Sequence, residues 1–322
     1  MSHAPHLRPS VPSGTHPIET GRYTLFTPPL GRFCDDLKNW VNNRAAGAIV
    51  TAPPRFGKSK GIRFAVDELR EELGAAFPVL TFCCQDHQYP TEARFFESLL
   101  SDLGHSLSHR GTASAKRARL AQFLVQQACV DHHQRLVLIG DEAQKLQEPQ
   151  YKWLVDIYND LDRHDIATTV VLVGQPELVH QRDAFEKAKK MQIVGRFMVH
   201  LHQFAGLRNQ KDFAYCLKGY DDESEYPEAS GCSFTRYFFP SGFEAGWRLA
   251  GEAKVLWEAF QHVRAEAKLP GKTEIPMQYF SRTVEFALRD YRSIDGGPPT
   301  ISLNQWKEAI ERSGYRDAGR YL

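Results

Sequence analysis

The feature that most constrains this chain is a short apolar run that leads into a loop ending in Gly-Lys-Ser. The apolar run covers residues 48–50, and the loop ends with Gly57, Lys58 and Ser59. A loop of this kind between a strand and a helix can cradle phosphate oxygens with its backbone N–H groups. In such a P-loop the lysine reaches the terminal phosphates and the following hydroxyl binds Mg²⁺. The segment therefore predicts a nucleoside triphosphate site.

One part of this loop departs from the pattern GxxxxGK[ST]. Ala52 stands where the pattern has glycine, and Pro53 and Pro54 have no N–H to donate. Gly57, the position nearest the phosphates, is kept, and a helical pattern follows over residues 58–66. Because a Gly-Lys-Ser tripeptide also arises by chance, a second motif is needed to support the site.

That second motif is a run of four apolar residues, 136–139, followed by Gly140, Asp141 and Glu142. It indicates a buried parallel strand with two carboxylates at its C-terminal end. Asp141 is expected to hold Mg²⁺, and Glu142 to polarise the water that attacks ATP. Without the Gly-Lys-Ser loop, a solvated acidic turn would be the better interpretation. The residues expected to bind MgATP are Pro54, Arg55, Phe56, Gly57, Lys58, Ser59, Lys60 and Asp141.

A third apolar run, residues 168–174, delivers Gln175 to the same edge of the predicted sheet. Ligands of open α/β sheets gather at the carboxyl ends of the strands, so this amide can contact the γ-phosphate or its attacking water. Gln175 is therefore a candidate catalytic sensor together with Glu142. The alternative is a loop amide that hydrogen-bonds the backbone before Pro176.

Taken together, the motifs resemble the AAA+ ATPases of the TniB/TnsC transposition-regulator family. The related proteins are the IstB helpers and the ExeA/GspA-type secretion ATPases. The resemblance covers roughly residues 23–215 and continues weakly to the end of the chain. The stretches that carry it are Asp141-Glu142-Ala143-Gln144, Val173-Gly174-Gln175-Pro176-Glu177-Leu178 and Ile193-Val194-Gly195-Arg196-Phe197.

The family resemblance implies a function in DNA transposition. Such ATPases form ATP-dependent homo-oligomers, rings or helical filaments, on double-stranded DNA. They link a TniQ-like target selector to the transposase, and ATP hydrolysis then drives disassembly. Two alternatives stay open. An ExeA-like secretion ATPase usually carries a membrane or wall-binding segment, and a nucleotide-switch signalling ATPase would need an effector domain.

The resemblance also assigns a role to Arg196, which matches the family's arginine finger. A guanidinium from a neighbouring subunit stabilises the charge of phosphoryl transfer only after assembly. An ordinary surface salt bridge at a helix end is the alternative for Arg196, and Arg182 is the reserve candidate. The second sensor arginine of the family lid has no counterpart at the expected place, because Arg282 lies one turn further on.

The best candidates for DNA contact are Lys116, Arg117 and Arg119, which follow a Gly- and Ser-containing loop. They could bind phosphates without reading sequence. The formal net charge of +1 provides no global basic field, and a solvated surface is the simpler interpretation of any one cluster. An oligomer would, however, repeat a few cations per subunit into a basic track.

The order of the elements predicts an α/β fold: a P-loop AAA+ core whose parallel sheet lies between helices, plus a small helical lid. We expect a disordered lead over residues 1–20, the core over 21–207 and the lid over 208–322. Residues 220–246 are interpreted as an insertion whose aromatic residues face a partner or pack the lid core. Residues 296–299 are expected to separate the last two helices.

Composition narrows the class of protein further. There is no apolar run of membrane-spanning length and no signal pattern, which predicts a cytoplasmic protein without membrane contact. The six cysteines include no CxxC pair, and the thirteen histidines show no zinc-site spacing. Reduced core cysteines are therefore expected, and the cofactors expected are ATP and Mg²⁺ alone.

Overall fold

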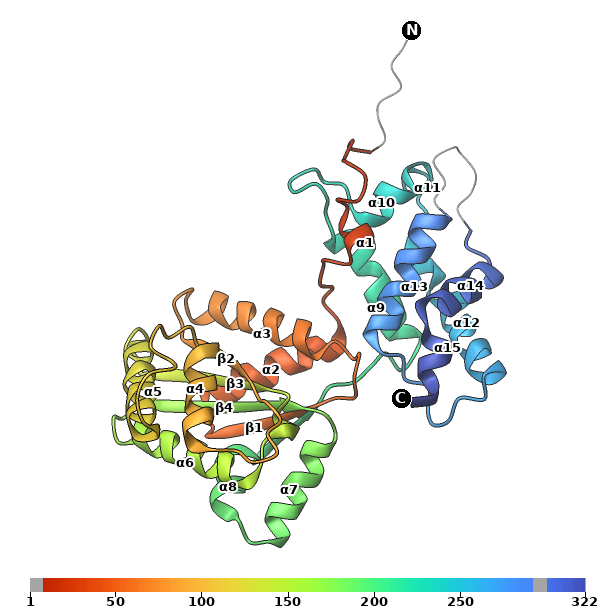
Figure 1. Ribbon diagram of the computed structural model, residues 1–322. Coiled ribbons are helices and arrows are strands. Elements are labelled where there is room, and N and C mark those ends of the chain that lie inside the picture. The colour runs from red at the N-terminus through yellow and green to blue at the C-terminus, as the bar shows by residue number, and fades with distance from the viewer. Residues whose placement is uncertain (1–7, 292–299, 322) are drawn as a thin grey trace. The chain divides into compact units, whose positions relative to one another are not determined.

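The computed structural model describes residues 8–291 and 300–321 of the chain (Figure 1). These residues form two compact units. The α/β unit contains residues 32–54 and 58–204, and the helical unit contains the residues up to Gly31, the loop residues 55–57 and the chain from Ala205 onward. The break expected at residues 296–299 lies outside the described residues.

A five-stranded parallel sheet forms the centre of the α/β unit. Its strands are β1 (Gly47–Thr51), β2 (Val79–Cys83), β3 (Arg135–Asp141), β4 (Ala167–Gly174) and β5 (His200–Gln203). The spatial order is β2-β3-β4-β1-β5, and every pairing is parallel. The central position of β1 and β4 explains why their residues are almost all buried and apolar. The predicted α/β fold is confirmed.

The sheet register determines which residues meet at the C-terminal edge. Thr51 pairs with Gly174, and Cys83 pairs with Asp141. Since β4 lies between β1 and β3, the loop after β1, the acidic pair after β3 and Gln175 after β4 emerge side by side. This juxtaposition is what the three sequence motifs required.

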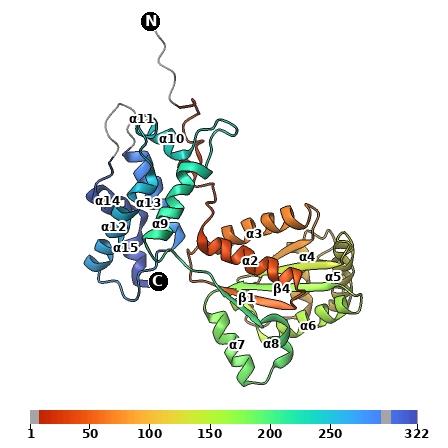
Figure 2. The ribbon, with the colours of Figure 1, turned by 180° about the vertical axis from the view of Figure 1, so that it is seen from behind.

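Helices cover both faces of the sheet (Figures 1 and 2). Helices α2 and α3 lie on one face, with α6 and α8 on the other. The helices of this unit are α2 (Pro28–Asn42), α3 (Lys58–Leu73), α4 (Glu92–Asp102), α5 (Ala113–Ala128), α6 (Glu148–Asp162), α7 (Glu177–Lys187) and α8 (Met191–Phe197). Helices α7 and α8 are separate, because α7 ends at Lys187 and Lys189 takes a left-handed φ of 56° before α8 begins. That backbone turn cannot belong to a continuous right-handed helix.

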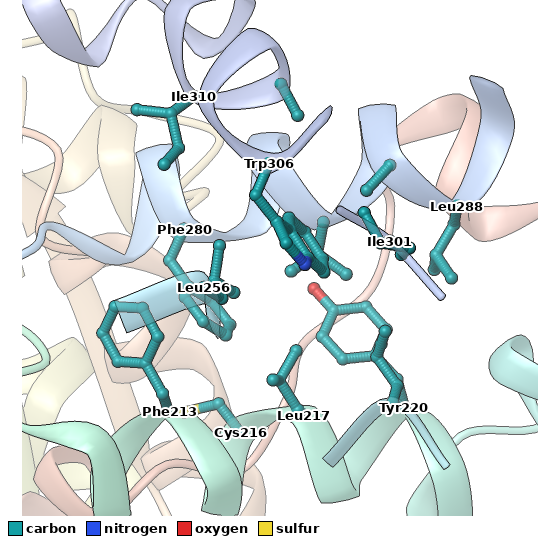
Figure 3. Packing of buried hydrophobic residues seen from close by; sticks show 14 of the residues in the cluster. Phe213, Cys216, Leu217, Tyr220, Leu256, Phe280, Leu288, Ile301, Trp306 and Ile310 are labelled. Atoms are coloured by element: carbon teal, nitrogen blue, oxygen red, sulfur yellow. The ribbon is translucent and has the colours of Figure 1, made fainter. Parts of the chain in front are cut away.

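The helical unit has a hydrophobic core of its own. Its helices are α9 (Gln210–Lys218), α10 (Phe234–Phe238), α11 (Pro240–Glu244), α12 (Ala253–Glu266), α13 (Met277–Asp290), α14 (Leu303–Ser313) and α15 (Tyr315–Ala318). Short 3₁₀ or π turns are η2 (Gly219–Glu223), η3 (Leu249–Glu252) and η4 (Gly319–Tyr321). Figure 3 shows Phe213, Leu217 and Tyr220 on one side of this core, with Trp306 and Phe280 on the other.

The chain before α2 belongs to the helical unit, so the two compact units do not divide the chain at the expected domain boundaries of 20/21 and 207/208, which stay predictions. The structure describes this segment from residue 8 onward, where a disordered lead was expected up to residue 20. Helix α1 (Pro17–Thr20) is capped at its N-terminus by His16, whose Nδ1 accepts the Ile18 N–H. Ile18 and Leu25 are part of the helical core, so apolar burial stabilises a segment whose Pro and Ser content suggested disorder.

Residues 220–246 form short helices that contribute to the same core, and an exposed loop precedes α10 (Figure 1). Phe234, Phe238 and Phe239 are each at most 4% exposed. Of the two interpretations of this aromatic cluster, packing inside the lid is the one that the structure shows. Asp221 ties the segment to η3 by accepting the N–H groups of Leu249 and Ala250, each at 2.9 Å.

Candidate nucleotide-binding site

The loop after β1 has the backbone bends of a phosphate-binding loop. Gly57 has a φ of 92°, a conformation that glycine adopts without the steric cost a side chain imposes. Arg55 also has a positive φ, 73°, which is uncommon for a residue with a side chain. Ala52, in contrast, continues β1: it is buried and donates its N–H to the carbonyl oxygen of Gly174. A glycine is therefore not needed at position 52.

Lys58 is the first residue of α3, and its side chain points toward the C-terminal end of β4. Its Nζ donates to the carbonyl oxygens of Ala52 at 3.2 Å and of Gly174 at 3.0 Å. Burial lowers the pKa of its ammonium group, and the carboxylates of Glu142, Asp141 and Glu177 oppose that shift. Three carboxylates around one cation leave an excess of negative charge, which favours the protonated form of Lys58.

Ser59 and Asp141 are brought together as the sequence predicts. Ser59 Oγ donates to Asp141 Oδ2 at 3.5 Å. A hydroxyl at the start of α3 and a carboxylate at the end of β3 are hard oxygen ligands of the type that Mg²⁺ prefers, so this pair fits that ion. The other oxygen, Asp141 Oδ1, accepts the backbone N–H of Glu142 at 2.8 Å, which fixes the carboxylate's orientation.

Glu142 lies directly beside this pair in a left-handed conformation, with φ 57° and ψ 34°. Backbone strain of this kind costs on the order of 1 kcal/mol and clusters at functional sites. Its Oε2 accepts the side-chain amide of Gln144 at 2.9 Å and lies 3.6 Å from Lys145 Nζ. The carboxylate is therefore held in a defined position.

Gln175 follows β4, half-buried, at the same edge. Its backbone N–H donates to Gln144 Oε1 at 3.1 Å. The alternative for Gln175 was an amide occupied with the local backbone. The described contacts involve its main chain, so its sensor role stays a prediction.

The remaining loop residues differ in accessibility. Pro54, Arg55 and Lys60 are exposed, whereas Phe56 is 6% exposed. The Phe56 side chain is therefore buried, although the residue is next to Gly57 in the loop. Their contacts to a nucleotide stay predictions.

Arg196 lies at the opposite end of the sheet from the P-loop of its own chain. A Cβ built on Gly47, the first residue of β1, would lie 2.5 Å from the Arg196 carbonyl oxygen. The P-loop follows the last residue of β1, roughly 13 Å away at 3.3 Å per residue. The Arg196 guanidinium donates to Asn159 Oδ1 at 2.9 Å and lies over the Tyr158 ring. Arg182 bonds to Glu186 on its own helix.

The three cations expected to contact DNA are all engaged within the α/β unit. Lys116 is buried and forms an ion pair with Glu97. Arg117 bridges Asp156 and Asp160, and Arg119 donates to the carbonyl oxygens of Leu107 and Arg110, both at 2.8 Å. The sequence predicted DNA contact for these side chains, with a solvated surface as the alternative, because alternation of basic and small residues does not reveal partners elsewhere in the chain. Their contact with DNA stays a prediction, and the structure does not favour it for Lys116.

Gln144 belongs to the stretch Asp141-Glu142-Ala143-Gln144, but the sequence alone indicates no role for it. Its contacts with both Glu142 and Gln175 place it at the centre of the site. The only signal in the sequence was its position two residues after Glu142. In the part of the chain that the structure describes, none of the helices is long and apolar enough to cross a bilayer.

Comparisons with known proteins concern the fold of the chain. Residues 42–181 match a family described as an AAA domain. The fold is similar to that of the Aeropyrum pernix ORC2 protein, at 13% identity and a TM-score of 0.52, over 92% of this chain and 71% of that one. A Drosophila ORC structure bound to DNA matches at 13% identity and a TM-score of 0.49, over 96% and 69% of the two chains. No curated protein is significantly similar in sequence. The AAA+ fold is confirmed, whereas membership of the TniB/TnsC family stays a prediction.

Proposed function

We propose that this protein is a Mg²⁺-dependent ATPase that oligomerises on double-stranded DNA and regulates transposition. The observation that carries the ATPase part is the meeting of Ser59 and Asp141 at 3.5 Å, with Lys58 and Glu142 beside them. The Aeropyrum pernix ORC2 structure, whose fold is similar, is described as ADPNP and ADP complexes. That description supports the same ligand class here.

Each residue would take a separate part in hydrolysis. The backbone at Gly57 and the Lys58 ammonium would bind the β- and γ-phosphates, and Ser59 and Asp141 would hold Mg²⁺. The ion, when bound, would neutralise charge on the phosphate oxygens. Glu142 would orient a water molecule and accept its proton as the oxygen attacks the γ-phosphorus. The bond from that phosphorus to the β–γ bridging oxygen breaks, which leaves ADP and inorganic phosphate.

The position of Arg196 supports a role for this residue in the ATP site of a neighbouring protomer. Its backbone lies beside Gly47, at the end of β1 that is a strand length of roughly 13 Å away from the P-loop, so its guanidinium would serve a neighbour's γ-phosphate more readily than its own. The Asn159 contact would have to break when it does so. ATP binding would then favour assembly, and hydrolysis would favour disassembly.

The DNA and transposition parts of the proposal rest on the resemblance to TniB/TnsC ATPases. In this proposal the assembled protein links a TniQ-like target selector to the transposase. Lys116, Arg117 and Arg119 are the proposed phosphate contacts, and their present partners would be exchanged for DNA. Arg110, exposed at the end of the preceding loop, can add a further cation.

Electron microscopy tests the proposal directly. The full chain is mixed with linear double-stranded DNA and either a slowly hydrolysed ATP analogue or ADP. We expect rings or filaments around the DNA with the analogue and their loss with ADP. Equal assembly with both nucleotides would remove ATP as the assembly signal, and absence of DNA-bound particles with both would contradict the DNA part.

A further inference from the structure

We propose that Gln144 is a positioning residue that fixes the Glu142 carboxylate and couples it to the end of the sensor strand β4. The inference rests on the proposed ATPase function and concerns the same site. Its basis is a single side-chain amide with two partners: Nε2 donates to Glu142 Oε2 at 2.9 Å, and Oε1 accepts the Gln175 N–H at 3.1 Å.

The chemistry of the two partners fixes how this amide is oriented. A backbone N–H can only donate, and an ionised carboxylate can only accept. The carbonyl oxygen of the amide must therefore face Gln175, and its NH₂ group must face Glu142. A glutamine is suited to this place because it offers a donor and an acceptor on one planar group.

The surroundings hold Gln144 itself in place. Its backbone carbonyl oxygen accepts Gln181 Nε2 at 2.7 Å, and Gln181 Oε1 accepts the hydroxyl of the buried Tyr151 at 3.1 Å. Gly174 makes room for the amide, because a Cβ there would lie 2.6 Å from Gln144 Oε1. The Gln144 backbone is thus held by Gln181 of α7, which Tyr151 of α6 holds in turn, and the Gln144 side chain fits closely against the end of β4.

These contacts connect the phosphate-binding lysine to the proposed catalytic carboxylate. Lys58 Nζ donates to the Gly174 carbonyl oxygen, the next residue's N–H donates to Gln144, and Gln144 donates to Glu142. A shift of residues 174–175 caused by a γ-phosphate would move Gln144 and with it the Glu142 carboxylate. Because a misplaced catalytic group loses much of its effect, Gln144 would let hydrolysis respond to what Lys58 and Gln175 bind.

Two substitutions separate the hydrogen bond that Gln144 donates to Glu142 from the one that it accepts from Gln175. Gln144→Ala removes both hydrogen bonds. Gln144→Glu is nearly isosteric and keeps an acceptor for the Gln175 N–H, but it places a second carboxylate against Glu142. Gln126→Ala, on the exposed side of α5 (Ala113–Ala128), is the matched control for loss of a glutamine side chain.

The first measurement is hydrogen exchange of the Gln175 amide in the full chain without nucleotide. We expect exchange about tenfold faster or more in Gln144→Ala, and unchanged exchange in Gln144→Glu and Gln126→Ala. Unchanged exchange in Gln144→Ala would overturn the coupling to β4.

The second measurement is steady-state ATP hydrolysis with double-stranded DNA present. We expect kcat to fall about 10- to 100-fold in both Gln144 variants, with KM within about twofold of wild type. In a Glu142→Gln background, Gln144→Ala should change the residual kcat less than about twofold, because it acts through Glu142. A merely structural role would lower kcat equally in both backgrounds.

The outcomes distinguish this inference from the proposed function. Wild-type protein that hydrolyses ATP while Gln144→Ala keeps full kcat overturns the role of Gln144 alone. Wild-type protein that neither binds a fluorescent ATP analogue nor hydrolyses ATP contradicts the proposed function, and the inference falls with it.

Discussion

Ser59 Oγ lies 3.5 Å from Asp141 Oδ2, although 82 residues separate the two in sequence. Their meeting follows from the parallel sheet, in which the loops after β1 and β3 emerge at the same edge with β4 between them. These two oxygen ligands from separate motifs are the proposed Mg²⁺ site.

Asp141→Asn should weaken the Mg²⁺ dependence of ATP binding. The neutral amide replaces a charged ligand, so we expect at least about a tenfold rise in the Mg²⁺ concentration that gives half-maximal ATP binding. Titration of Mg²⁺ against a fluorescent ATP analogue measures this. Asp183→Asn, exposed on α7, is the control for loss of a carboxylate charge. An unchanged Mg²⁺ requirement in Asp141→Asn would remove Asp141 from the metal site.

Glu142→Gln should separate ATP binding from hydrolysis. The amide cannot accept a proton from water, so we expect kcat to fall by about 10²–10⁴-fold while ATP affinity is kept. ATP-bound oligomers should then persist on DNA for longer than those of wild type. Size-exclusion chromatography after ATP dilution measures their lifetime. Disassembly at the wild-type rate would argue against Glu142 as the general base.

How much of this site could be read from the sequence depends on which contacts are local. Strand ends and loop motifs are local patterns, so the sequence predicts that residues 57–59 and 141–142 lie at one edge of the sheet. The Gln144 contacts depend on the exact approach of β4 to η1 (Ala143–Lys145), which no pattern encodes. The burial of Lys116 could not be predicted for the same reason, because its partner Glu97 lies on another helix.

The N-terminal segment shows a second limit of sequence patterns. Its Pro and Ser content predicted disorder up to residue 20, yet His16 and Ile18 are fully or almost fully buried in the helical unit. A few apolar anchors are sufficient when a complementary surface exists elsewhere in the chain. Composition alone cannot reveal that surface, which here consists of Tyr226, Phe234, Tyr237 and Phe238 around the His16 ring.

His16 should make the stability of the helical unit depend on pH. Burial lowers the pKa of its imidazole to about 4 from 6.5, and Glu19 opposes the shift. Between pH 4 and pH 6.5 the unfolded chain binds a proton at His16 more strongly than the folded chain does. Burial of the neutral imidazole therefore makes its full contribution to the free energy of unfolding above pH 6.5. It is lost as the pH falls from 6.5 toward 4, and it amounts to at most about 3 kcal/mol.

Thermal unfolding at pH 7.5 and pH 5.0 checks this, with His16→Asn as the comparison. Asparagine keeps an N-cap acceptor for α1 but does not titrate. We expect the difference in Tm between the two pH values to be smaller in His16→Asn than in wild type. An equal difference in the two proteins would show that His16 is not the titrating group.

Two glycines near Arg196 should respond in opposite directions to alanine. A Cβ at Gly47 would lie 2.5 Å from the Arg196 carbonyl oxygen and 2.8 Å from the Val170 carbonyl oxygen, whereas a Cβ at Gly195 meets nothing within 4 Å. We expect Gly47→Ala to lower the free energy of unfolding by about 2 kcal/mol or more. Gly195→Ala, in α8, should raise it by about 0.5–1 kcal/mol. Chemical denaturation measures both, and a neutral Gly47→Ala would contradict the packing of α8 against β1.

Calorimetric titration of the full chain with ATP, in the presence and absence of Mg²⁺, tests the central claim most directly. We expect saturable binding that Mg²⁺ strengthens, and a loss of at least about 100-fold in affinity for Lys58→Ala, because a charge-assisted phosphate contact is removed. Lys189→Ala, exposed between α7 and α8, should bind ATP like wild type. Absence of ATP binding by the wild-type chain, or binding unaffected by Lys58→Ala, would contradict a nucleotide site at this edge of the sheet.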